Sequence, residues 1–368
     1  MVLWLSIFVF YFIFMLLLAG GLLRWRKSKN PANHTLAVSV VVAMRNEALN
    51  LQTLVGSLAQ QNYACPWQLL LVDDHSEDNT IQVAQILKHQ YSNLDVSILQ
   101  SPGDGKKQAL ATGIENATGE IILTTDADCE LPVDWITDMV NSFGKSTQLV
   151  AGAVRLKATA TFFGKMQAVE FTSVMAAGLG MLGWGKPVMC NGASLAFRKS
   201  AFAAVGGYAG NEQVASGDDE FLMRKIAGKF PGSIRAVRYG NNTCTTKPAA
   251  TISEFYDQRI RWAGKWSVNS SGLARFVGVF VFLFQVTWLP VVAIALFTQS
   301  PLLLAGVVLK ILLEFVVLAL AARFIHQQFY LPAFLVLQIL YPPYVILVAL
   351  SSQILGYRWK GRSFLPPR

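Results

Sequence analysis

Two carboxylates stand one residue apart in the run Asp126-Ala127-Asp128, directly after the apolar stretch Ile121 to Thr125. In an extended segment alternate side chains point to the same side, so both carboxylates can reach one ligand. Magnesium is usually held by one or two carboxylates together with water and substrate phosphate oxygens, and manganese prefers similar donors. The pair therefore favours a divalent cation site, with capping of a helix near Pro132 as an equal alternative.

A second acidic pair, Asp73-Asp74, follows the apolar run Leu69 to Val72. Carboxylates at a strand end can accept hydrogen bonds from a nucleobase or a ribose. The alternative is turn and helix-cap chemistry, because Asp, Ser and Asn favour such positions. We expect both, with Asp78 or Asn79 capping the next helix while Asp73 and Asp74 face a crevice.

Three carboxylates crowd the start of a helical run at Gly217-Asp218-Asp219-Glu220. The helix dipole stabilises acidic side chains there, which is a purely structural explanation. The functional explanation assigns one of the carboxylates as the general base that removes a proton from an acceptor hydroxyl.

Gln258, Arg261 and Trp262 fall at positions i, i+3 and i+4 of the helical run 252–266, so they share one helical face. A planar guanidinium that is always charged suits a diphosphate, and an indole can stack on a sugar ring. The alternative is an amphipathic helix at a membrane interface, where Trp and Arg are common.

Short β-rich runs alternate with helical stretches from Ala37 onward. Successive βα units predict a parallel sheet covered by helices on both faces, with ligands at the carboxyl ends of the strands. Both acidic pairs follow strands, so this pattern places them at one edge of the sheet. The expected strands are 37–43, 68–72, 96–99 and 121–124, and the expected helices are 49–61, 80–90 and 106–114.

The composition indicates a membrane protein, because 53% of the residues are hydrophobic and only 14% are charged, against about 25% charged in ordinary soluble domains. Segments 2–23 and 276–298 are uncharged, and each can cross a hydrocarbon core of ~30 Å as a helix. A third segment, 301–322, is apolar apart from Lys310 and Glu314, which we expect to pair with each other. A fourth, 329–357, is interrupted by Pro332, Pro342 and Pro343.

Basic residues follow the first apolar segment. This segment is too long for the apolar part of a cleaved signal peptide and has the wrong flanks, so we interpret it as a membrane anchor. The positive-inside rule then places the middle of the chain in the cytoplasm and the N-terminus outside. Four spans would leave the basic tail 358–368 outside as well. Either one C-terminal segment is re-entrant or interfacial, with Pro342-Pro343 as the natural break, or the tail violates the rule. The basic residues concerned are Arg24, Arg26, Lys27 and Lys29.

The net charge of +9 is compatible with nucleic acid, but the basic residues gather at the borders of the apolar segments. Anionic membrane lipids are therefore the expected partner, and nucleic acid is not. The four cysteines lack the spacing of metal ligands, and we interpret them as reduced packing residues. They are Cys65, Cys129, Cys190 and Cys244.

In order and combination these motifs resemble the membrane-bound family 2 glycosyltransferases, relatives of cellulose, chitin and hyaluronan synthases and of ceramide glucosyltransferase. The resemblance extends roughly from Ser39 to Trp262. It implies an α/β, Rossmann-like GT-A catalytic domain in the cytoplasm, with one N-terminal and about three C-terminal transmembrane helices. The motifs are Arg45-Asn46-Glu47, Val72-Asp73-Asp74, Gly105-Lys106, Asp126-Ala127-Asp128, Gly192 with Arg198, Gly206-Gly207-Tyr208, Gly217-Asp218-Asp219 and Gln258-Arg259-Ile260-Arg261-Trp262.

The resemblance also implies the role of each site residue. Asp219 is the catalytic base with Asp218 beside it, and Asp128 is the main carboxylate for Mg²⁺ or Mn²⁺. The implied substrate-binding residues are Asp74 for a uracil-type base with Glu47 nearby, Lys106 and Asp126 for the donor, and Gln258, Arg261 and Trp262 for the diphosphate and the acceptor. The sequence departs from the family pattern at Ala43, His75 and Gly217-Asp218, which weakens any assignment of the donor sugar by analogy.

The resulting prediction is an inverting transfer of a sugar from a nucleotide-sugar, expected to be a UDP-sugar, to a hydroxyl of a lipid-linked or short glycan acceptor. It implies synthesis of a cell-envelope polysaccharide or glycolipid at the cytoplasmic membrane. The predicted organisation is an anchor at 1–23, a GT-A domain at 36–270 with an interfacial helix at 252–266, transmembrane segments at 274–357 and a basic tail at 358–368.

Three alternatives remain at this stage. The chain can be a processive polysaccharide synthase. However, the small number of C-terminal apolar segments favours a lipid-linked acceptor over a polymer channel. It can also be a membrane scaffold or transport component that binds nucleotide without turnover. A nucleotidyl or sugar-phosphate transferase would share the acidic metal site but has no evident use for Gln258, Arg261 and Trp262.

Overall fold

The computed structural model describes residues 2–24, 35–210, 217–237, 243–265 and 272–364. The chain divides into two compact units. The helical unit comprises Met1–Trp25, Ala158–Val188 and Pro248–Arg368, and the sheet unit comprises Arg26–Lys157 and Met189–Lys247. Arg26, Lys27, Lys29 and Trp266, which figure in the sequence predictions, lie outside the described residues.

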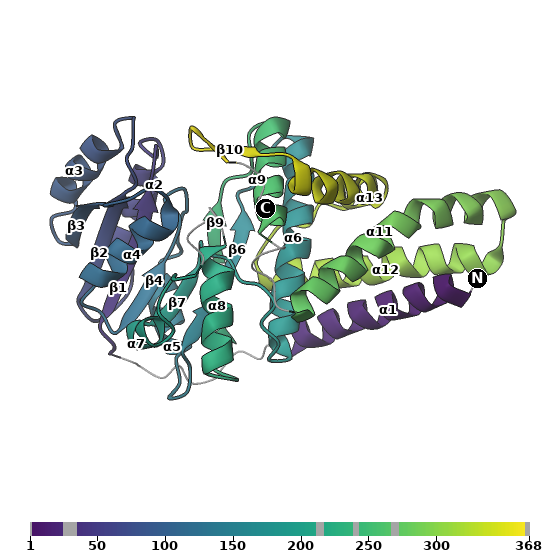
Figure 1. Ribbon diagram of the computed structural model, residues 1–368, viewed down its shortest axis with the longest axis horizontal. Coiled ribbons are helices and arrows are strands. Elements are labelled where there is room, and N and C mark those ends of the chain that lie inside the picture. Colours follow the sequence, from purple (N-terminus) through teal and green to yellow (C-terminus); the bar gives the residue numbers. More distant parts are fainter. Residues whose placement is uncertain (1, 25–34, 211–216, 238–242, 266–271, 365–368) are drawn as a thin grey trace. The chain divides into compact units, whose positions relative to one another are not determined.

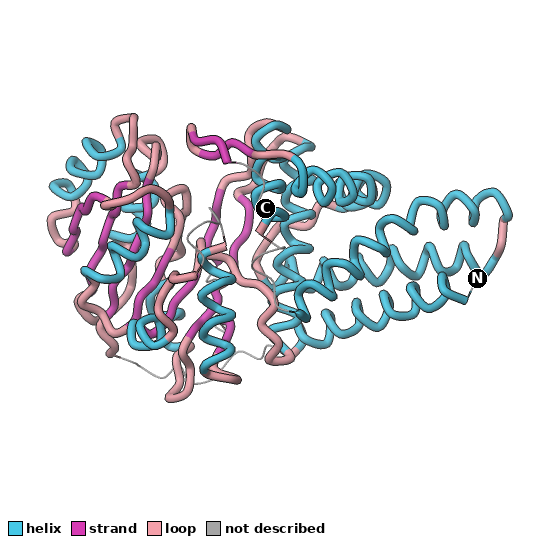
Figure 2. The backbone as a smooth tube through the Cα atoms, viewed as in Figure 1, coloured by secondary structure: helices cyan, strands magenta, loops and turns pink. Residues whose placement is uncertain are grey.

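A seven-stranded sheet forms the centre of the sheet unit, in the order β3-β2-β1-β4-β7-β5-β8. Strand β1 pairs in parallel with both β2 and β4, and β2 pairs in parallel with β3. The predicted parallel pairing is thus confirmed for these strands, whereas β7 is antiparallel to both β4 and β5. The strands are β1 Val38–Met44, β2 Trp67–Asp73, β3 Asp95–Gln100, β4 Ile121–Thr124, β5 Leu149–Ala151, β7 Leu195–Arg198 and β8 Ile234–Ala236, drawn in magenta in Figure 2.

Three helices connect the first four strands: α2 (Leu51–Ala59), α3 (Thr80–Gln90) and α4 (Lys106–Asn116). The central strands are buried over nearly their whole length, as expected for a parallel sheet covered on both faces. Helix α4 approaches β1 so closely that a Cβ atom on Gly113 would lie 2.4 Å from Cγ1 of Val41. Close packing of this kind fixes where α4 begins, and therefore where Lys106 stands.

The rest of the sheet unit extends this core. Helices α5 (Trp135–Asn141), α7 (Lys199–Ala204) and α8 (Asp218–Lys229) follow later strands, and β6 (Ala153–Leu156) pairs in parallel with β9 (Thr243–Thr246). The fully buried Trp135 donates a hydrogen bond to Oγ of Ser194, 3.0 Å away. That bond ties α5 to the segment that leads into β7.

The helical unit consists of long helices and one hairpin. Among the residues that the structure describes, four helices are long and apolar enough to cross a membrane: α1, α11, α12 and α13. In Figure 1, α1, α11 and α12 run side by side and α6 runs across them, while α9 lies beside α13. The elements are α1 Val2–Leu23, α6 Phe162–Gly183, α9 Ile252–Gly264, α11 Gly272–Thr298, α12 Pro301–Phe324, α13 Leu331–Ile354, β10 Tyr357–Trp359 and β11 Arg362–Phe364.

Helix α6 lies against α1, although the sequence analysis groups it with the catalytic domain. Their crossing is lined by glycines: a Cβ atom on Gly21 would lie 1.8 Å from the carbonyl oxygen of Gly180, and one on Gly183 would lie 2.2 Å from that of Gly21. Small residues allow apolar helices to pack backbone against backbone in a membrane. The contact therefore binds a helix from the middle of the sequence to the N-terminal anchor.

Helix α13 continues without interruption through Pro342 and Pro343, so no break falls where the sequence analysis places one. The expected pairing of Lys310 with Glu314 is confirmed, with Nζ and Oε2 2.9 Å apart. Gln338 of α13 donates to Glu314 (3.0 Å) and accepts from Lys310 (2.7 Å). Polar side chains thus connect α12 and α13 among apolar neighbours.

Candidate active site

Lys106, the first residue of α4, lies between carboxylates from two other segments. Its Nζ atom is 2.6 Å from Asp126, just beyond β4, and 3.6 Å from Asp218, the first residue of α8. Burial lowers the pKa of Lys106, but the charges of Asp126 and Asp218 outweigh it and raise this pKa above its usual value. Lys106 is therefore a permanent cation that holds the start of α8 beside the end of β4.

Asp219 reaches the same place because β7 runs antiparallel to β4. The residues that enter β7 therefore lie beside the carboxyl end of β4, where Thr124 donates a hydrogen bond to the carbonyl oxygen of Gly192 (3.4 Å). The backbone N–H of Gly192 in turn donates to Oδ2 of Asp219 (2.8 Å). Gly217 precedes α8 with φ of 79°, a left-handed conformation that glycine adopts without strain.

Asp128 is held by residues that follow it or lie far away in the sequence. Its Oδ2 atom accepts a hydrogen bond from Oγ1 of Thr246 in β9 (3.2 Å), and its Oδ1 atom contacts Sγ of Cys129 (3.8 Å). Asp126 and Asp128 are both partly exposed, while Ala127 between them is buried. Two partly exposed carboxylates at one strand end are a donor set that fits a hard divalent cation such as Mg²⁺ or Mn²⁺.

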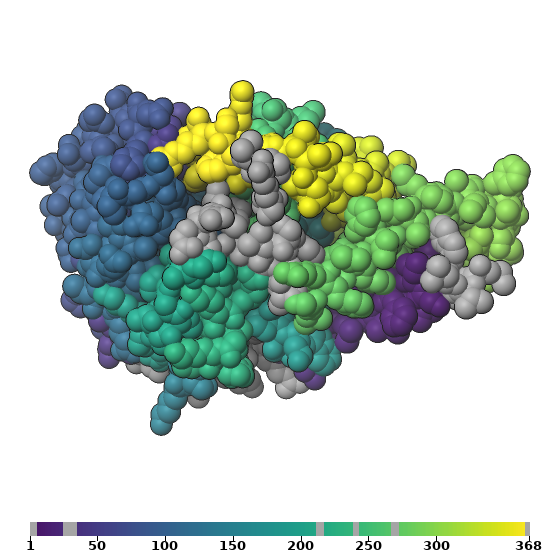
Figure 3. All heavy atoms as spheres, viewed as in Figure 1, coloured from purple at the N-terminus to yellow at the C-terminus, as the bar shows by residue number. Residues whose placement is uncertain are grey.

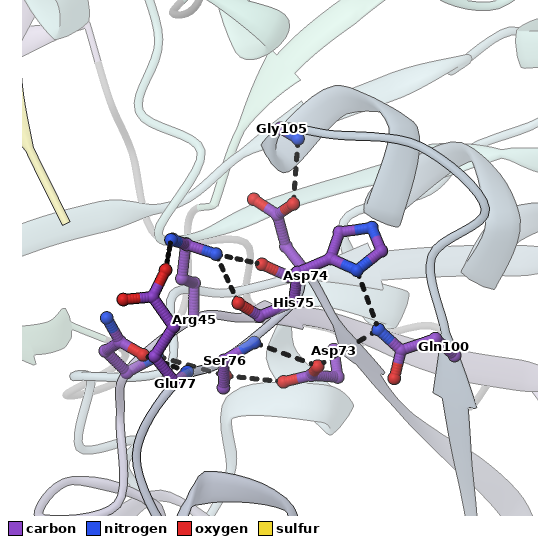
Figure 4. Close-up of polar contacts among 9 residues, drawn as sticks. Arg45, Asp73, Asp74, His75, Ser76, Glu77, Gln100 and Gly105 are labelled. Carbon is purple, nitrogen blue, oxygen red and sulfur yellow. Dashed lines mark hydrogen bonds and ion pairs between the residues drawn. The ribbon is translucent and has the colours of Figure 1, made fainter. Parts of the chain in front are cut away.

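Arg45 organises the turn after β2 (Figure 4). Its Nη1 atom donates to the carbonyl oxygens of Asp74 (2.9 Å) and His75, and its Nη2 atom lies 2.7 Å from the Glu77 carboxylate. The backbone N–H of Gly105 donates to Oδ1 of Asp74 (2.8 Å). These bonds fix the Asp74 carboxylate next to Gly105, the residue that directly precedes Lys106 and the start of α4.

The prediction that Asp73 faces a crevice is wrong. The Asp73 side chain is buried and accepts three hydrogen bonds. Two come from Ser76, from its backbone N–H (3.1 Å) and from its hydroxyl (2.5 Å), and the third comes from the Gln100 amide (3.3 Å). Asp73 therefore closes the turn that presents Asp74. Of the two expected capping residues, Asn79 occupies the N-cap position of α3 without a side-chain cap bond, and Asp78 accepts a hydrogen bond from the N–H of Thr80 (3.0 Å) in the preceding turn.

His75 and Asp104 lie beside Asp74 at this turn. One ligand atom from each of the three residues lies within 4.8 Å of the others. His75 is exposed, has φ of 55° and contacts the Gln100 amide through Nδ1 (3.3 Å). The expectation that His75 is a solvated loop residue agrees with this exposure.

Glu47 lies beyond the end of β1, which is paired with β2 and so ends at the same edge as Asp74. It is buried, its N–H donates to Oγ1 of Thr80 (2.7 Å), and its carboxylate accepts from the Asn50 amide (2.6 Å). Glu47 thus forms hydrogen bonds with the start of α3 and with the loop before α2.

Gln258, Arg261 and Trp262 belong to the helical unit, where α9 carries them. The Gln258 amide oxygen accepts a hydrogen bond from Arg259, whose guanidinium lies 4.4 Å from the centroid of the Trp262 ring. Arg261 instead lies 5.4 Å from the ring centroid of Trp359 in the C-terminal hairpin. The grouping of these residues with the acidic cluster remains a prediction.

Several residues around the acidic cluster have no role assigned by the sequence analysis. Tyr208 is buried, and burial together with the charge of Asp218 raises the pKa of its hydroxyl. Tyr208 belongs to the motif Gly206-Gly207-Tyr208, so the sequence contained a signal that could have pointed to it as a site residue. Thr246 offers no such signal, since its contact with Asp128 joins residues 118 positions apart.

Comparison with known proteins identifies the class. Residues 39–205 match the family described as Glycosyl transferase family 2. This match, which covers β1 to the segment after α7, includes Asp74, Lys106, Asp126 and Asp128. Residues 39–205 thus form a domain of the family 2 glycosyltransferase type, and the protein is a glycosyltransferase.

The relatives agree with this class. A poly-beta-1,6-N-acetyl-D-glucosamine synthase of Staphylococcus epidermidis is 24% identical over 318 residues, 77% of this chain and 73% of that protein. Glycosyltransferase AglE of Haloferax volcanii is 32% identical over 119 residues, 32% of this chain and 39% of that protein. A Pyrobaculum calidifontis mannosyltransferase, PcManGT, solved with GDP-Man and Mn²⁺, matches with a TM-score of 0.58 at 20% identity, over 95% of this chain and 97% of that one. The likeness to this structure establishes the GT-A fold.

Proposed function

We propose that this glycosyltransferase moves a sugar from a nucleotide-sugar, a UDP-sugar in our assignment, to a hydroxyl of a lipid-linked or short glycan acceptor, with inversion at the anomeric carbon. Such a reaction serves the synthesis of a cell-envelope polysaccharide or glycolipid. The observation that carries the proposal is the gathering of Lys106, Asp126, Asp218 and Asp219 at the carboxyl end of β4. In α/β sheets this is where ligands bind.

Asp219 acts as the general base in this proposal. Its carboxylate accepts hydrogen bonds from the N–H groups of Gly192 (2.8 Å) and Glu220 (2.7 Å), which hold it in one orientation. It removes the proton from the acceptor hydroxyl, the oxygen attacks the anomeric carbon, and the nucleoside diphosphate departs from the opposite side. Asp218, held by Lys106, keeps the start of α8 in place during this step.

The other site residues bind the donor. Asp74 accepts hydrogen bonds from the base, with Glu47 supporting the same edge, and Lys106 and Asp126 contact the sugar-diphosphate. Asp128 would hold Mg²⁺ or Mn²⁺, which offsets negative charge on the departing diphosphate. On α9, Arg261 binds the diphosphate, and Gln258 and Trp262 bind the acceptor. PcManGT was solved with a nucleotide-sugar and Mn²⁺, and the oxygen donors of Asp126 and Asp128 suit the same kind of ion.

The helical unit supports a cytoplasmic position for the catalytic residues. The hairpin after α13 contacts α9, because Arg358 donates its N–H to Asp257 (3.4 Å) and Trp359 lies by Arg261. Segments before α11 and after α13 are therefore on one side, so the chain crosses the membrane an even number of times between them. We assign α1, α11 and α12 as spans and α13, which has no break, as interfacial. The basic tail then lies on the cytoplasmic side, as the positive-inside rule requires.

A processive polysaccharide synthase is the second candidate, favoured by the match with the Staphylococcus epidermidis synthase over 77% of this chain. Three spanning helices in one chain leave little room for a polymer channel, which supports a lipid-linked acceptor. The chain length of the radiolabelled product separates the two: a single added sugar supports the lipid-linked acceptor, and a ladder of products supports the synthase.

The proposal is tested by the release of nucleoside diphosphate from a panel of UDP- and GDP-sugars. Detergent-purified protein is supplied with Mg²⁺ or Mn²⁺ and with membrane lipids as acceptors. Turnover with one donor, abolished by Asp219→Asn and reduced by Asp128→Ala, is the expected result and names the sugar. No turnover with any donor, in protein that folds and binds nucleotide, would favour the non-catalytic nucleotide-binding scaffold.

A further inference from the structure

A buried ion pair joins α6 to α9 in the helical unit. Nε of Arg259 donates to Oε1 of Glu170 at 3.0 Å, and Nη2 donates to Oε2 of the same carboxylate. The two side chains are only 5% and 6% exposed. Paired hydrogen bonds between a guanidinium and a carboxylate fix the relative orientation of both groups, so Glu170 sets the plane of the Arg259 guanidinium.

That guanidinium lies between two aromatic rings of α9. Its central carbon is 4.3 Å from the ring centroid of Phe255 and 4.4 Å from that of Trp262. Phe255 and Trp262 stand four residues before and three residues after Arg259, so all three side chains lie on one face of the helix. The Trp262 ring also lies 6.2 Å from that of Phe171, which follows Glu170 in α6.

A third helix closes the same arrangement. The hydroxyl of Tyr344 in α13 donates to Oε1 of Glu170 (3.1 Å), and its ring lies 5.6 Å from that of Phe255. The Glu170 carboxylate thus receives hydrogen bonds from α9 and from α13. A buried carboxylate needs this degree of compensation, because removing either partner leaves an uncompensated charge away from water.

A second ion pair among the described residues of this unit, with Lys310 buried and Glu314 partly buried, provides a contrast. Lys310 and Glu314 both belong to α12, and their polar partners are Tyr11 of α1 and Gln338 of α13. Lys310 also lies 4.2 Å from the ring centroid of Trp288 in α11. These contacts connect the long helices with one another and involve no residue of α9.

We propose that Glu170 is a positioning residue for the transfer reaction: through Arg259 it holds the Trp262 indole in the orientation that binds the acceptor. This inference rests on the proposed function, because Trp262 has a substrate role only there. It adds Glu170, Arg259 and Tyr344 to the residues on which the reaction depends, although none of them contacts a substrate.

The first test compares Glu170→Gln with Glu314→Gln, each of which neutralises one ion-paired carboxylate of the same unit. Misplacing a binding group by ~1 Å can cost about 10²-fold in rate, so we expect Glu170→Gln to lower kcat/KM by about that factor. Glu314→Gln should lower Tm but leave kcat/KM per folded molecule within about twofold of the wild type. Equal losses in both variants would reduce Glu170 to a general role in stability and overturn the proposal.

The second test asks whether Glu170 acts through Trp262. A double-mutant cycle with Glu170→Gln and Trp262→Ala measures their coupling in kcat/KM. If Glu170 only orients Trp262, the double variant should be no slower than Trp262→Ala alone. Fully additive losses would show that the two residues act independently, which contradicts the proposal.

A spectroscopic measurement keeps this inference separate from the transferase assignment. The fluorescence of Trp262 is obtained as the difference between the parent protein and its Trp262→Phe variant. Glu170→Gln should move this difference spectrum to longer wavelength, because the indole loses its packed position, whereas Glu314→Gln should leave it unchanged. An unchanged spectrum in Glu170→Gln would refute the positioning role even if no donor is turned over. Absence of turnover together with the expected shift would instead contradict only the proposed function.

Discussion

Lys106 in the sheet unit lies between two carboxylates, Asp126 and Asp218, and is close to a third, whereas the buried cations Arg259 and Lys310 of the helical unit each pair with one. The surroundings differ as well. The Lys106 and Asp126 side chains are 20% and 35% exposed, while Lys310 is 3% exposed and Arg259 is 5% exposed. One region holds an excess of partly accessible acids, and the other holds matched charges away from water.

This difference indicates what each set of charges is for. Matched buried pairs contribute orientation and fix how helices meet, because both ions are already compensated. Carboxylates in excess at an accessible strand end instead repel one another unless a cation binds there. The acidic cluster thus suits ligands that bring positive charge, and the pairs of the helical unit suit a structural role.

The comparison is tested most strongly by Asp219→Asn, which should lower transfer by about 10³-fold, because a general base contributes 10²–10⁴-fold. The asparagine oxygen can still accept the hydrogen bond from Gly192, so Tm should change little. Nucleoside diphosphate release and differential scanning fluorimetry measure the two quantities. Asp134→Asn, an exposed acid of the same unit bonded to Asn62, is the matched control, and equal activity in the two variants would argue against Asp219 as the base.

The matched pair of α12 should behave in the opposite way. Lys310→Met leaves Glu314 uncompensated and should destabilise the protein by about 3 kcal/mol. Adding Glu314→Gln removes the second charge, keeps an acceptor for Tyr11, and should recover most of the lost stability. Thermal unfolding in detergent reports both variants, and activity per folded molecule should stay constant. A double variant less stable than Lys310→Met would mean that mutual charge compensation does not explain the stability of this pair.

Asp128→Ala should reduce transfer by about 10²-fold, comparable to the loss of one charge-stabilising group in other active sites. Chelation of divalent cations should reduce wild-type activity by a similar factor and affect Asp128→Ala much less. Thr246→Val removes only the hydroxyl that donates to Asp128 and should cost less than either. An equal response of wild type and Asp128→Ala to chelation would place the cation elsewhere.

The smallest expected effect concerns packing in the helical unit. A Cβ atom on Gly21 would lie 1.8 Å from the Gly180 carbonyl oxygen, so Gly21→Ala must separate α1 from α6 and should cost about 2 kcal/mol. Gly306→Ala in α12 meets no atom within 4 Å among the described residues and should leave Tm unchanged or raised. Similar Tm values for the two variants would contradict the close crossing.

The sequence predicts the first part of the sheet unit well, for a clear physical reason. Strand β2, for instance, is an apolar run that ends at acidic turn residues, and α3 begins directly after Asn79, as the sequence predicts. Such local signals place β1 to β4 and α2 to α4 within a few residues of their observed bounds. The resemblance to family 2 glycosyltransferases predicts the GT-A fold. In the structure, β7 joins the sheet in antiparallel orientation beside β4.

Partners distant in the sequence were beyond prediction. Helix α6 contains Lys165 and Glu170, so its sequence is typical of a soluble domain. The hydrogen bonds from Arg259 and Tyr344 explain why a buried carboxylate is stable there. Asp73 and Asp74 are adjacent buried acids, yet Asp73 accepts hydrogen bonds from Ser76 and Gln100 that close the turn, whereas Asp74 accepts one from the N–H of Gly105 before α4. These outcomes depend on tertiary contacts that no local pattern encodes.

The central claim is that the acids around the end of β4 bind a nucleotide together with a divalent cation. Titration calorimetry with UDP and GDP, with and without Mn²⁺, measures this directly on the wild type, Asp128→Ala and Glu314→Gln. We expect one nucleotide to bind only when Mn²⁺ is present, Asp128→Ala to lose this dependence, and Glu314→Gln to retain it. Binding that is equally strong in all three proteins and independent of Mn²⁺ would contradict it.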